Sequence, residues 1–185
     1  NAMSLQMVAE LRAVLAAGRD DRTVRALVLS GAGGHFCAGG DIKDMANARV
    51  QGADAYRELN RAFGALLEQA QHAPQVLITV LQGAVLGGGF GLACVSDIAI
   101  SDHKAQFGLP ETSLGLIPAQ IAPFVVQRIG LTETRRLALT AARFDGAEAQ
   151  RLGLVHFVEQ DAQALAVQLD EVLQQVLRCA PEASA

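Results

Sequence analysis

The sequence predicts an α/β protein, because short apolar strands alternate with amphipathic helices along the chain. Of the 185 residues, 51% are hydrophobic and 18% are charged, which is typical of a globular protein. The predicted connections are short, and no low-complexity stretch or change of composition marks a boundary. We therefore expect one domain over residues 1–185.

The first half of the chain alternates two helices with two strands. In each helix, apolar residues recur at three- and four-residue spacing, and a glycine or proline follows the last turn. Each strand is a short apolar run with β-branched residues. In order, these elements are a helix from Met3 to Ala17, a strand from Val24 to Leu29, a helix from Asp54 to His72 and a strand from Val76 to Leu81.

The second half repeats a strand, a loop and a helix about three times, which is typical of stacked ββα units. A glycine turn at residues 87–89 leads into a short buried helix at residues 92–95. The remaining predicted elements are strands from Asp97 to Ser101, Ala105 to Phe107 and Leu154 to Val158, and helices from Pro123 to Ile129, Thr132 to Ala141, Gly146 to Leu152 and Asp161 to Arg178.

Charge and composition exclude several classes of partner. The chain has 15 basic and 19 acidic residues and no cluster of lysine and arginine, so we expect no nucleic-acid or membrane partner. No apolar run reaches the roughly 20 residues of a membrane span, and no basic segment with an apolar stretch opens the chain. The three cysteines form no CxxC pair, and the four histidines lie in unrelated contexts, so we expect a cytoplasmic protein without a metal site.

The glycine turn Gly87–Gly89 has two interpretations. Glycine lets a backbone approach a ligand closely, and the N-terminus of a helix presents unpaired N–H groups to an anion. A dinucleotide fingerprint fails here, because Leu92 stands where its third glycine belongs. The glycines could equally serve a tight crossing between strand and helix, and the turn alone favours neither interpretation.

A second glycine-rich loop covers residues 35–41 and could offer another backbone donor. Two converging amides make an oxyanion hole, in which loss of one donor typically costs about 10²–10³ in rate. Within this loop, Asp41 is expected chiefly as the N-cap of a following helix, and Cys37 as a packing residue.

Glu111 is the most informative carboxylate of the sequence. It lies between Pro110 and Thr112 among apolar neighbours, which would raise its pKa and suit it to general acid or base catalysis. The alternative is a structural carboxylate that caps the backbone at residues 112–113 or pairs with an arginine.

Several segments together resemble the enoyl-CoA hydratase/isomerase, or crotonase, superfamily. The matching segments, in the family's order and spacing, are residues 36–45, 83–93, 97–100, 107–118 and 147–158, with Asn1–Ser4 resembling the start of the family's first helix. The resemblance covers nearly the whole chain, and it implies a crotonase-like spiral of stacked ββα units.

The resemblance also implies roles for individual residues. The backbone N–H groups of Ala38 and Gly88 would hold the thioester oxygen of an acyl-CoA, and Glu111 falls where the family has a catalytic glutamate. Coenzyme A would be part of the substrate, and no separate cofactor is implied. The further substrate-binding positions are Gly39, Gly40, Asp41, Ile42, Gly87, Pro110 and Gln120.

The chain departs from well-known hydratases at Gly91, where they carry a second glutamate. Gln120 is a candidate helper, and a lone glutamate would equally suit Δ3,Δ2-enoyl-CoA isomerisation or a CoA-thioester binding protein without catalysis. An RNA-binding member is disfavoured, because lysine occurs only at positions 43 and 104. The apolar segment 118–124 suggests a branched or long acyl group. The sequence of residues 83–97 and 118–131 most resembles the isohexenylglutaconyl-CoA hydratases of acyclic-terpene degradation.

The family's opening hairpin and closing helices have no counterpart here. Those helices usually build a trimer, so we expect a homotrimer or hexamer when they are present. Asn1 and Ala2 are open to two interpretations, as native residues or as a cloning scar.

Overall fold

The computed structural model describes residues 1–184 and has an α/β fold, which confirms the predicted class. Its larger sheet contains four parallel strands in the order β1-β2-β4-β7. A smaller sheet has the order β3-β5-β6, in which β6 is antiparallel to β5. The strand bounds are β1 Ala26–Ser30, β2 Val76–Leu81, β3 Ala84–Leu86, β4 Ile98–Asp102, β5 Gln106–Gly108, β6 Arg143–Phe144 and β7 Phe157–Glu159.

Consecutive ββα units stack on each other, as the sequence predicts. One unit contains β2, β3 and the helix α4 (Gly88–Val95), and the next contains β4, β5 and α5 (Ala122–Thr140). Because β2 pairs with β4 while β3 pairs with β5, corresponding strands of the two units lie side by side in both sheets. This arrangement places the turn before α4 next to the end of β5, where Gly87 N donates to Gly108 O at 3.1 Å.

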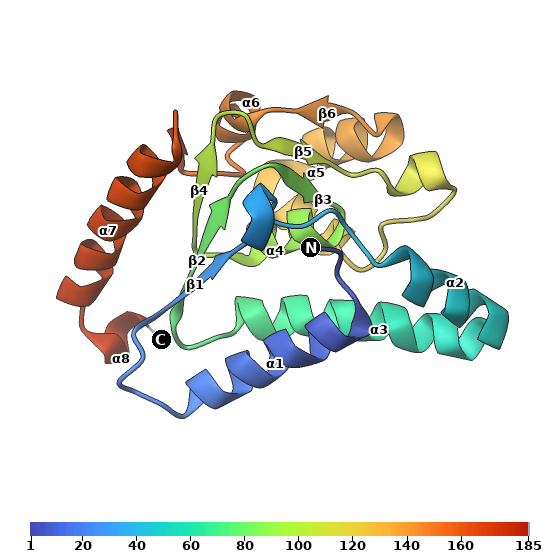
Figure 1. Cartoon of the computed structure of the whole chain (residues 1–185), viewed down its shortest axis with the longest axis horizontal. Helices are drawn as coiled ribbons and strands as arrows, with labels where there is room; N and C mark the ends of the chain where they lie inside the picture. The colour runs from blue at the N-terminus through green and yellow to red at the C-terminus, as the bar shows by residue number, and fades with distance from the viewer. Residues whose placement is uncertain (185) are drawn as a thin grey trace.

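Helices cover the larger sheet from different sides (Figure 1). The helix α7 packs on β2, β4 and β7 through a cluster that includes Ile78, Ile100 and Val172. The main core lies around α4, where Phe90 meets Phe107 edge to face with centroids 6.4 Å apart. The remaining helices are α1 Leu5–Arg19, α2 Ile42–Gln51, α3 Ala53–Gln71, α6 Gly146–Arg151, α7 Ala162–Arg178 and α8 Pro181–Ser184, with short 3-10 turns η1 at Ala32–Gly34 and η2 at Glu111–Leu114.

Differences from the predicted elements have local causes. The two helices expected after residue 122 are both present within α5, where Gly130, with φ 78° and ψ 163°, separates them. The predicted strand at residues 154–158 is shifted to Phe157–Glu159, because the Leu154 and Val155 amides donate to Ala149 O instead of to a strand. Strands as short as β6 give too little alternation to be predicted.

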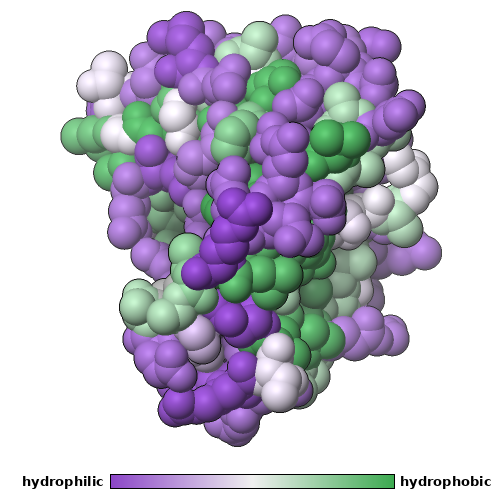
Figure 2. Space-filling view, turned by 90° about the vertical axis from the view of Figure 1, so that its left-hand side faces the viewer, coloured by the Kyte–Doolittle hydropathy of each residue, from purple (hydrophilic) through white to green (hydrophobic). Residues whose placement is uncertain are grey.

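The surface on the side of α7 is mostly hydrophilic, with a smaller apolar patch below its middle (Figure 2). Within residues 1–184, no helix combines the length and hydropathy needed to cross a membrane.

Candidate active site

A cavity of about 470 Å³ lies between α2, α3, the two glycine loops and the segment that follows β5. The predicted site residues that line it are Ala38, Gly39, Gly40, Ile42, Gly87, Gly88, Pro110, Glu111 and Gln120. Asp41 does not line it: its Oδ1 accepts from Lys43 N at 2.8 Å and Asp44 N at 3.1 Å, which caps α2. The expected role of Asp41 as an N-cap is therefore confirmed, and its place in the substrate site stays a prediction.

The turn Gly87–Gly89 serves both tight packing and access to the cavity. A Cβ at Gly89 would lie 2.6 Å from Cys37 Cβ, and one at Gly87 would lie 2.8 Å from Glu111 Oε1. Gly87 also has a φ of 51°, which a residue with a side chain rarely adopts. Gly88 is the first residue of α4, so its N–H has no acceptor within the helix. The two interpretations of the turn are thus compatible.

The backbone amide of Ala38 is already hydrogen-bonded, whereas the sequence predicts a free donor. Cys37 forms a parallel bridge with Val85, and the next amide, Ala38 N, donates to Asn1 O at 3.0 Å. Met3, which is buried, continues this contact, because its N donates to Gly39 O at 2.8 Å. The first residues of the chain therefore occupy the hydrogen-bonding position of the Ala38 amide.

Glu111 begins η2 and is half-buried beside Gly87. Its Oε2 is shielded from solvent and has no hydrogen-bond partner. Burial raises the pKa of this carboxyl, and the nearby charge of Arg143 only partly offsets the effect. The neighbouring hydroxyls bond elsewhere, with Thr112 Oγ1 donating to Ala138 O and Ser113 Oγ to Pro110 O. The geometry favours a proton-exchanging carboxyl over a structural cap.

The position of the missing second carboxylate is filled by apolar side chains. A Cβ at Gly91 would lie 2.8 Å from Ile121 Cγ2 and 3.1 Å from Leu67 Cδ1. A glutamate would therefore not fit here without displacing them. Gln120 lines the cavity, but its amide lies against Gly64 of α3.

The sequence interpretation did not identify the polar residues on the α2 and α3 side of the cavity. Arg49, Tyr56 and Asn60 line it together with Phe63 and Leu67. The four α3 residues share one helical face, and this spacing was the available signal. Periodicity identifies the face that points inward, but it does not distinguish a packed core from a cavity wall.

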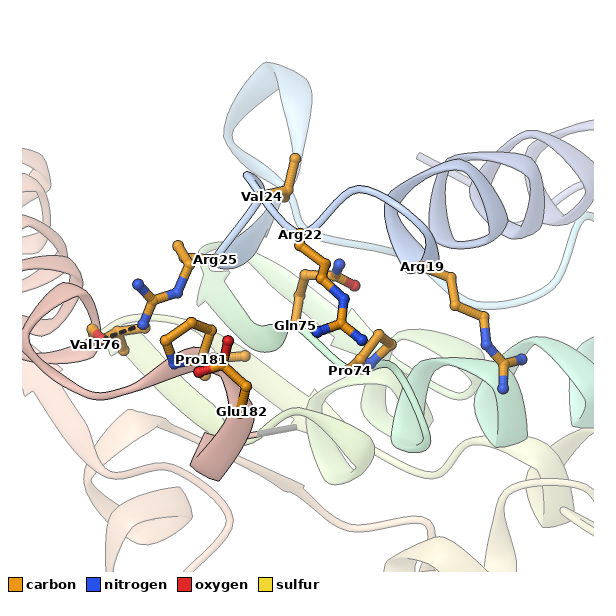
Figure 3. Close-up of a pocket in the computed structure, with 10 residues that line it drawn as sticks. Arg19, Arg22, Val24, Arg25, Pro74, Gln75, Val176, Pro181 and Glu182 are labelled. Atoms are coloured by element: carbon orange, nitrogen blue, oxygen red, sulfur yellow. Dashed lines mark hydrogen bonds between the residues drawn. The ribbon is translucent and has the colours of Figure 1, made fainter.

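A second, smaller cavity of about 260 Å³ lies where the end of α1 and the start of β1 approach α8 (Figure 3). Three arginines line it, and one of them, Arg25, donates to Val176 O at 3.5 Å and to Cys179 O. None of the predicted site residues reaches this cavity. The larger cavity is therefore the candidate active site.

Comparisons with known proteins match one family over the whole chain. The family model "Enoyl-CoA hydratase/isomerase" matches residues 1–185. An enoyl-CoA hydratase, AFT6-1, of Alternaria alternata is 32% identical over 100% of this chain and 60% of its own length. The chain thus spans about 60% of the length of such curated relatives.

Solved structures show the same fold. AtuE of Pseudomonas aeruginosa is 75% identical with a TM-score of 0.97, over 99% of this chain and 71% of that one. An enoyl-CoA hydratase/isomerase from Marinobacter aquaeolei is 57% identical with a TM-score of 0.96, over 100% of this chain and 72% of that one. The fold is that of the crotonases, and the chain belongs to the enoyl-CoA hydratase/isomerase family.

Proposed function

We propose that the protein is an acyl-CoA hydratase, which adds water across the α,β double bond of an enoyl thioester of coenzyme A. The observation that carries this proposal is the buried, unpartnered Oε2 of Glu111 in a cavity that the N-terminus of α4 also lines. Membership of the family, whose curated relatives include proteins named enoyl-CoA hydratase, supports it.

The chemistry needs one carboxylate and a donor for the thioester oxygen. Ionised Glu111 takes a proton from water while the water oxygen bonds to Cβ, and the π electrons move to the thioester oxygen to give an enolate. The Gly88 N–H stabilises this oxygen, and Ala38 N becomes the second donor when the oxygen replaces Asn1 O. Glu111 then returns the proton to Cα, so one carboxyl performs both transfers and Gly91 needs no acid.

The acyl group in this proposal is branched and resembles isohexenylglutaconyl. Apolar side chains make up much of the cavity lining, and they would surround a branched apolar acyl group. They are Leu59, Phe63, Leu67, Leu114, Leu116, Ile117 and Ile121.

The test is hydration of isohexenylglutaconyl-CoA by the protein and by Glu111→Gln. We expect Glu111→Gln to lower kcat by about 10²–10⁴-fold, the contribution of a general acid–base group. Glu58→Gln is the matched control, because Glu58 is exposed on α3 and does not line the cavity. Undiminished formation of the 3-hydroxy product by Glu111→Gln would contradict the proposal.

The absence of a second carboxylate at Gly91 also favours a Δ3,Δ2-enoyl-CoA isomerase. In D₂O, an isomerase would incorporate solvent deuterium without the mass gain of water, whereas a hydratase gives both. Binding of thioesters without any turnover would instead indicate a non-catalytic binding protein.

A further inference from the structure

One side of the cavity gathers three polar side chains that the hydration chemistry does not use. Arg49 of α2 and Tyr56 and Asn60 of α3 all line the cavity. The Arg49 guanidinium lies over the Tyr56 ring, 5.9 Å from its centroid, and Asn60 Nδ2 donates to the backbone carbonyl of Tyr56 at 2.7 Å. The stacked guanidinium and phenol therefore line the cavity one helical turn from the Asn60 amide.

The charge of this group is uncompensated. Among residues 1–184, Arg49 is the one cation that lines the cavity, and no carboxylate lies within ion-pair distance of it. An arginine guanidinium matches a carboxylate with two parallel hydrogen bonds, and stacking on an aromatic ring leaves its N–H edge available. The group therefore fits an anion, for which the Tyr56 hydroxyl is a second donor.

The position of the group along α3 separates it from the reacting end. Leu67 lies against Gly91, one turn along α4 from Gly88. Asn60 and Tyr56 share the cavity-facing side of α3 and lie about 10 and 16 Å toward its N-terminus from Leu67, at 1.5 Å per residue. An anion bound there belongs to a part of the ligand other than the thioester.

We propose that Arg49, with Tyr56 and Asn60, binds a free carboxylate of the acyl group. The substrate is then an enoyl-CoA that carries a second carboxyl group, and Arg49 determines this specificity. The inference rests on the proposed function, because it concerns the occupant of the same cavity. The other anion that such a ligand could supply is a phosphate of coenzyme A.

Binding of two unreactive thioesters distinguishes these two anions. Glutaryl-CoA ends in a carboxylate, whereas valeryl-CoA has the same chain length and ends in a methyl group, and both carry the same phosphates. By calorimetry, we expect Arg49→Gln to weaken glutaryl-CoA about 10- to 100-fold, as for a charge-assisted hydrogen bond, and valeryl-CoA less than about threefold. Arg49→Lys should keep part of the preference, and Tyr56→Phe should lose about 3- to 10-fold for glutaryl-CoA alone.

Arg61→Gln is the matched control, since Arg61 follows Asn60, is exposed and does not line the cavity. Equal weakening of both thioesters by Arg49→Gln would assign the arginine to coenzyme A and overturn the inference, as would unchanged binding of glutaryl-CoA. Melting curves check that each variant folds. If Arg49→Gln does not fold, weaker binding of glutaryl-CoA alone by Tyr56→Phe supports the inference, and unchanged binding contradicts it.

Turnover is a separate readout, because these saturated thioesters cannot be hydrated. Discrimination in binding by a protein that hydrates no enoyl-CoA would contradict the proposed function and support the carboxylate site. Hydration of an enoyl-CoA without discrimination between the two ligands would support the proposed function and contradict the carboxylate site.

Discussion

Glu111 shows how one side chain can be costly for folding and useful for chemistry. Its Oε2 is buried without a partner, so the charged form of the carboxyl loses hydration that a hydrogen bond from the Glu111 backbone only partly replaces. The pKa of the carboxyl is raised as a result, with desolvation as the main cause. Such a group exchanges protons closer to neutral pH than a solvated glutamate does.

Activity should follow the ionisation of Glu111. Because the proposed first step needs the carboxylate, kcat should fall as the pH drops through its raised pKa, at a higher pH than the roughly 4.3 of a free glutamate. A pH profile of kcat checks this, and a profile that stays flat down to pH of about 4.5 would contradict it.

The free energy of unfolding should change with pH in the direction opposite to that of activity. A carboxyl whose pKa is higher in the folded state stabilises the fold fully below its unfolded pKa, and this contribution is lost as the pH rises through the folded pKa. Glu111→Gln has no such loss, so it should melt at a higher temperature than the parent protein at neutral pH. The difference should vanish in acid, which thermal melts at several pH values would test.

At Gly91, apolar side chains occupy the space that a second carboxylate would need. Since a Cβ would lie 2.8 Å from Ile121 Cγ2, Gly91→Ala should lower the free energy of unfolding by about 1–3 kcal/mol. Ile121→Ala should relieve much of this cost, and a double-mutant cycle measures the coupling. Additive effects of the two substitutions would show that Ile121 does not restrict this position.

At the scale of elements, α2 carries the residues that approach the cavity from one side, and its start is fixed by the Asp41 side chain. The cap accepts hydrogen bonds from two amides of the first turn. The orientation of Arg49, near the other end of α2, therefore depends on a helix whose N-terminus is held by a side chain.

Asp41→Ala should lower the free energy of unfolding by about 1 kcal/mol, the usual contribution of an N-cap. Asp41→Asn retains an acceptor oxygen and should lose much less. Chemical denaturation of the two variants checks this, and equal losses would indicate a role for the charge beyond capping.

The elements also show what a sequence can predict here. Helical spacing and β-branched runs predicted α1, α3, α7 and most strands, because those signals are local. The glycine-loop residues and Glu111 were predicted through their motifs, and the structure brings them together. Arg49 and Tyr56 were missed because only the packing of α2 on α3 turns a helical face into a cavity wall. The contact of Asn1 with Ala38 depends on segments far apart in sequence and has no local signal.

At the scale of the whole molecule, the cavity lies between the stacked ββα units and the pair α2 and α3 rather than inside one core cluster. Its rim is apolar and solvent-exposed, since Ile42, Leu114 and Ile117 line it and are 81%, 66% and 83% exposed. A ligand that covers this rim would remove apolar surface from water and stabilise the folded state.

An acyl-CoA at about 100 times its Kd should therefore raise the free energy of unfolding by about 2.7 kcal/mol. For a chain of this size, each kcal/mol corresponds to a Tm shift of about 2–4 °C. Glu111→Gln should keep the shift, because it removes proton transfer and not the cavity. A shift with free coenzyme A equal to that with its acyl thioester would indicate that the acyl group stays outside.

The hydrogen bond from Ala38 to Asn1 has a consequence for selectivity between ground state and transition state. A neutral thioester carbonyl that displaces the Asn1 carbonyl trades one uncharged acceptor for another, so the exchange contributes little to affinity. An enolate oxygen carries negative charge and is the stronger acceptor, so the same exchange becomes favourable only once the double bond has been attacked. In the proposed mechanism, the Ala38 amide would therefore be available to the enolate and not to the resting substrate, which lowers the energy of the reacting state alone.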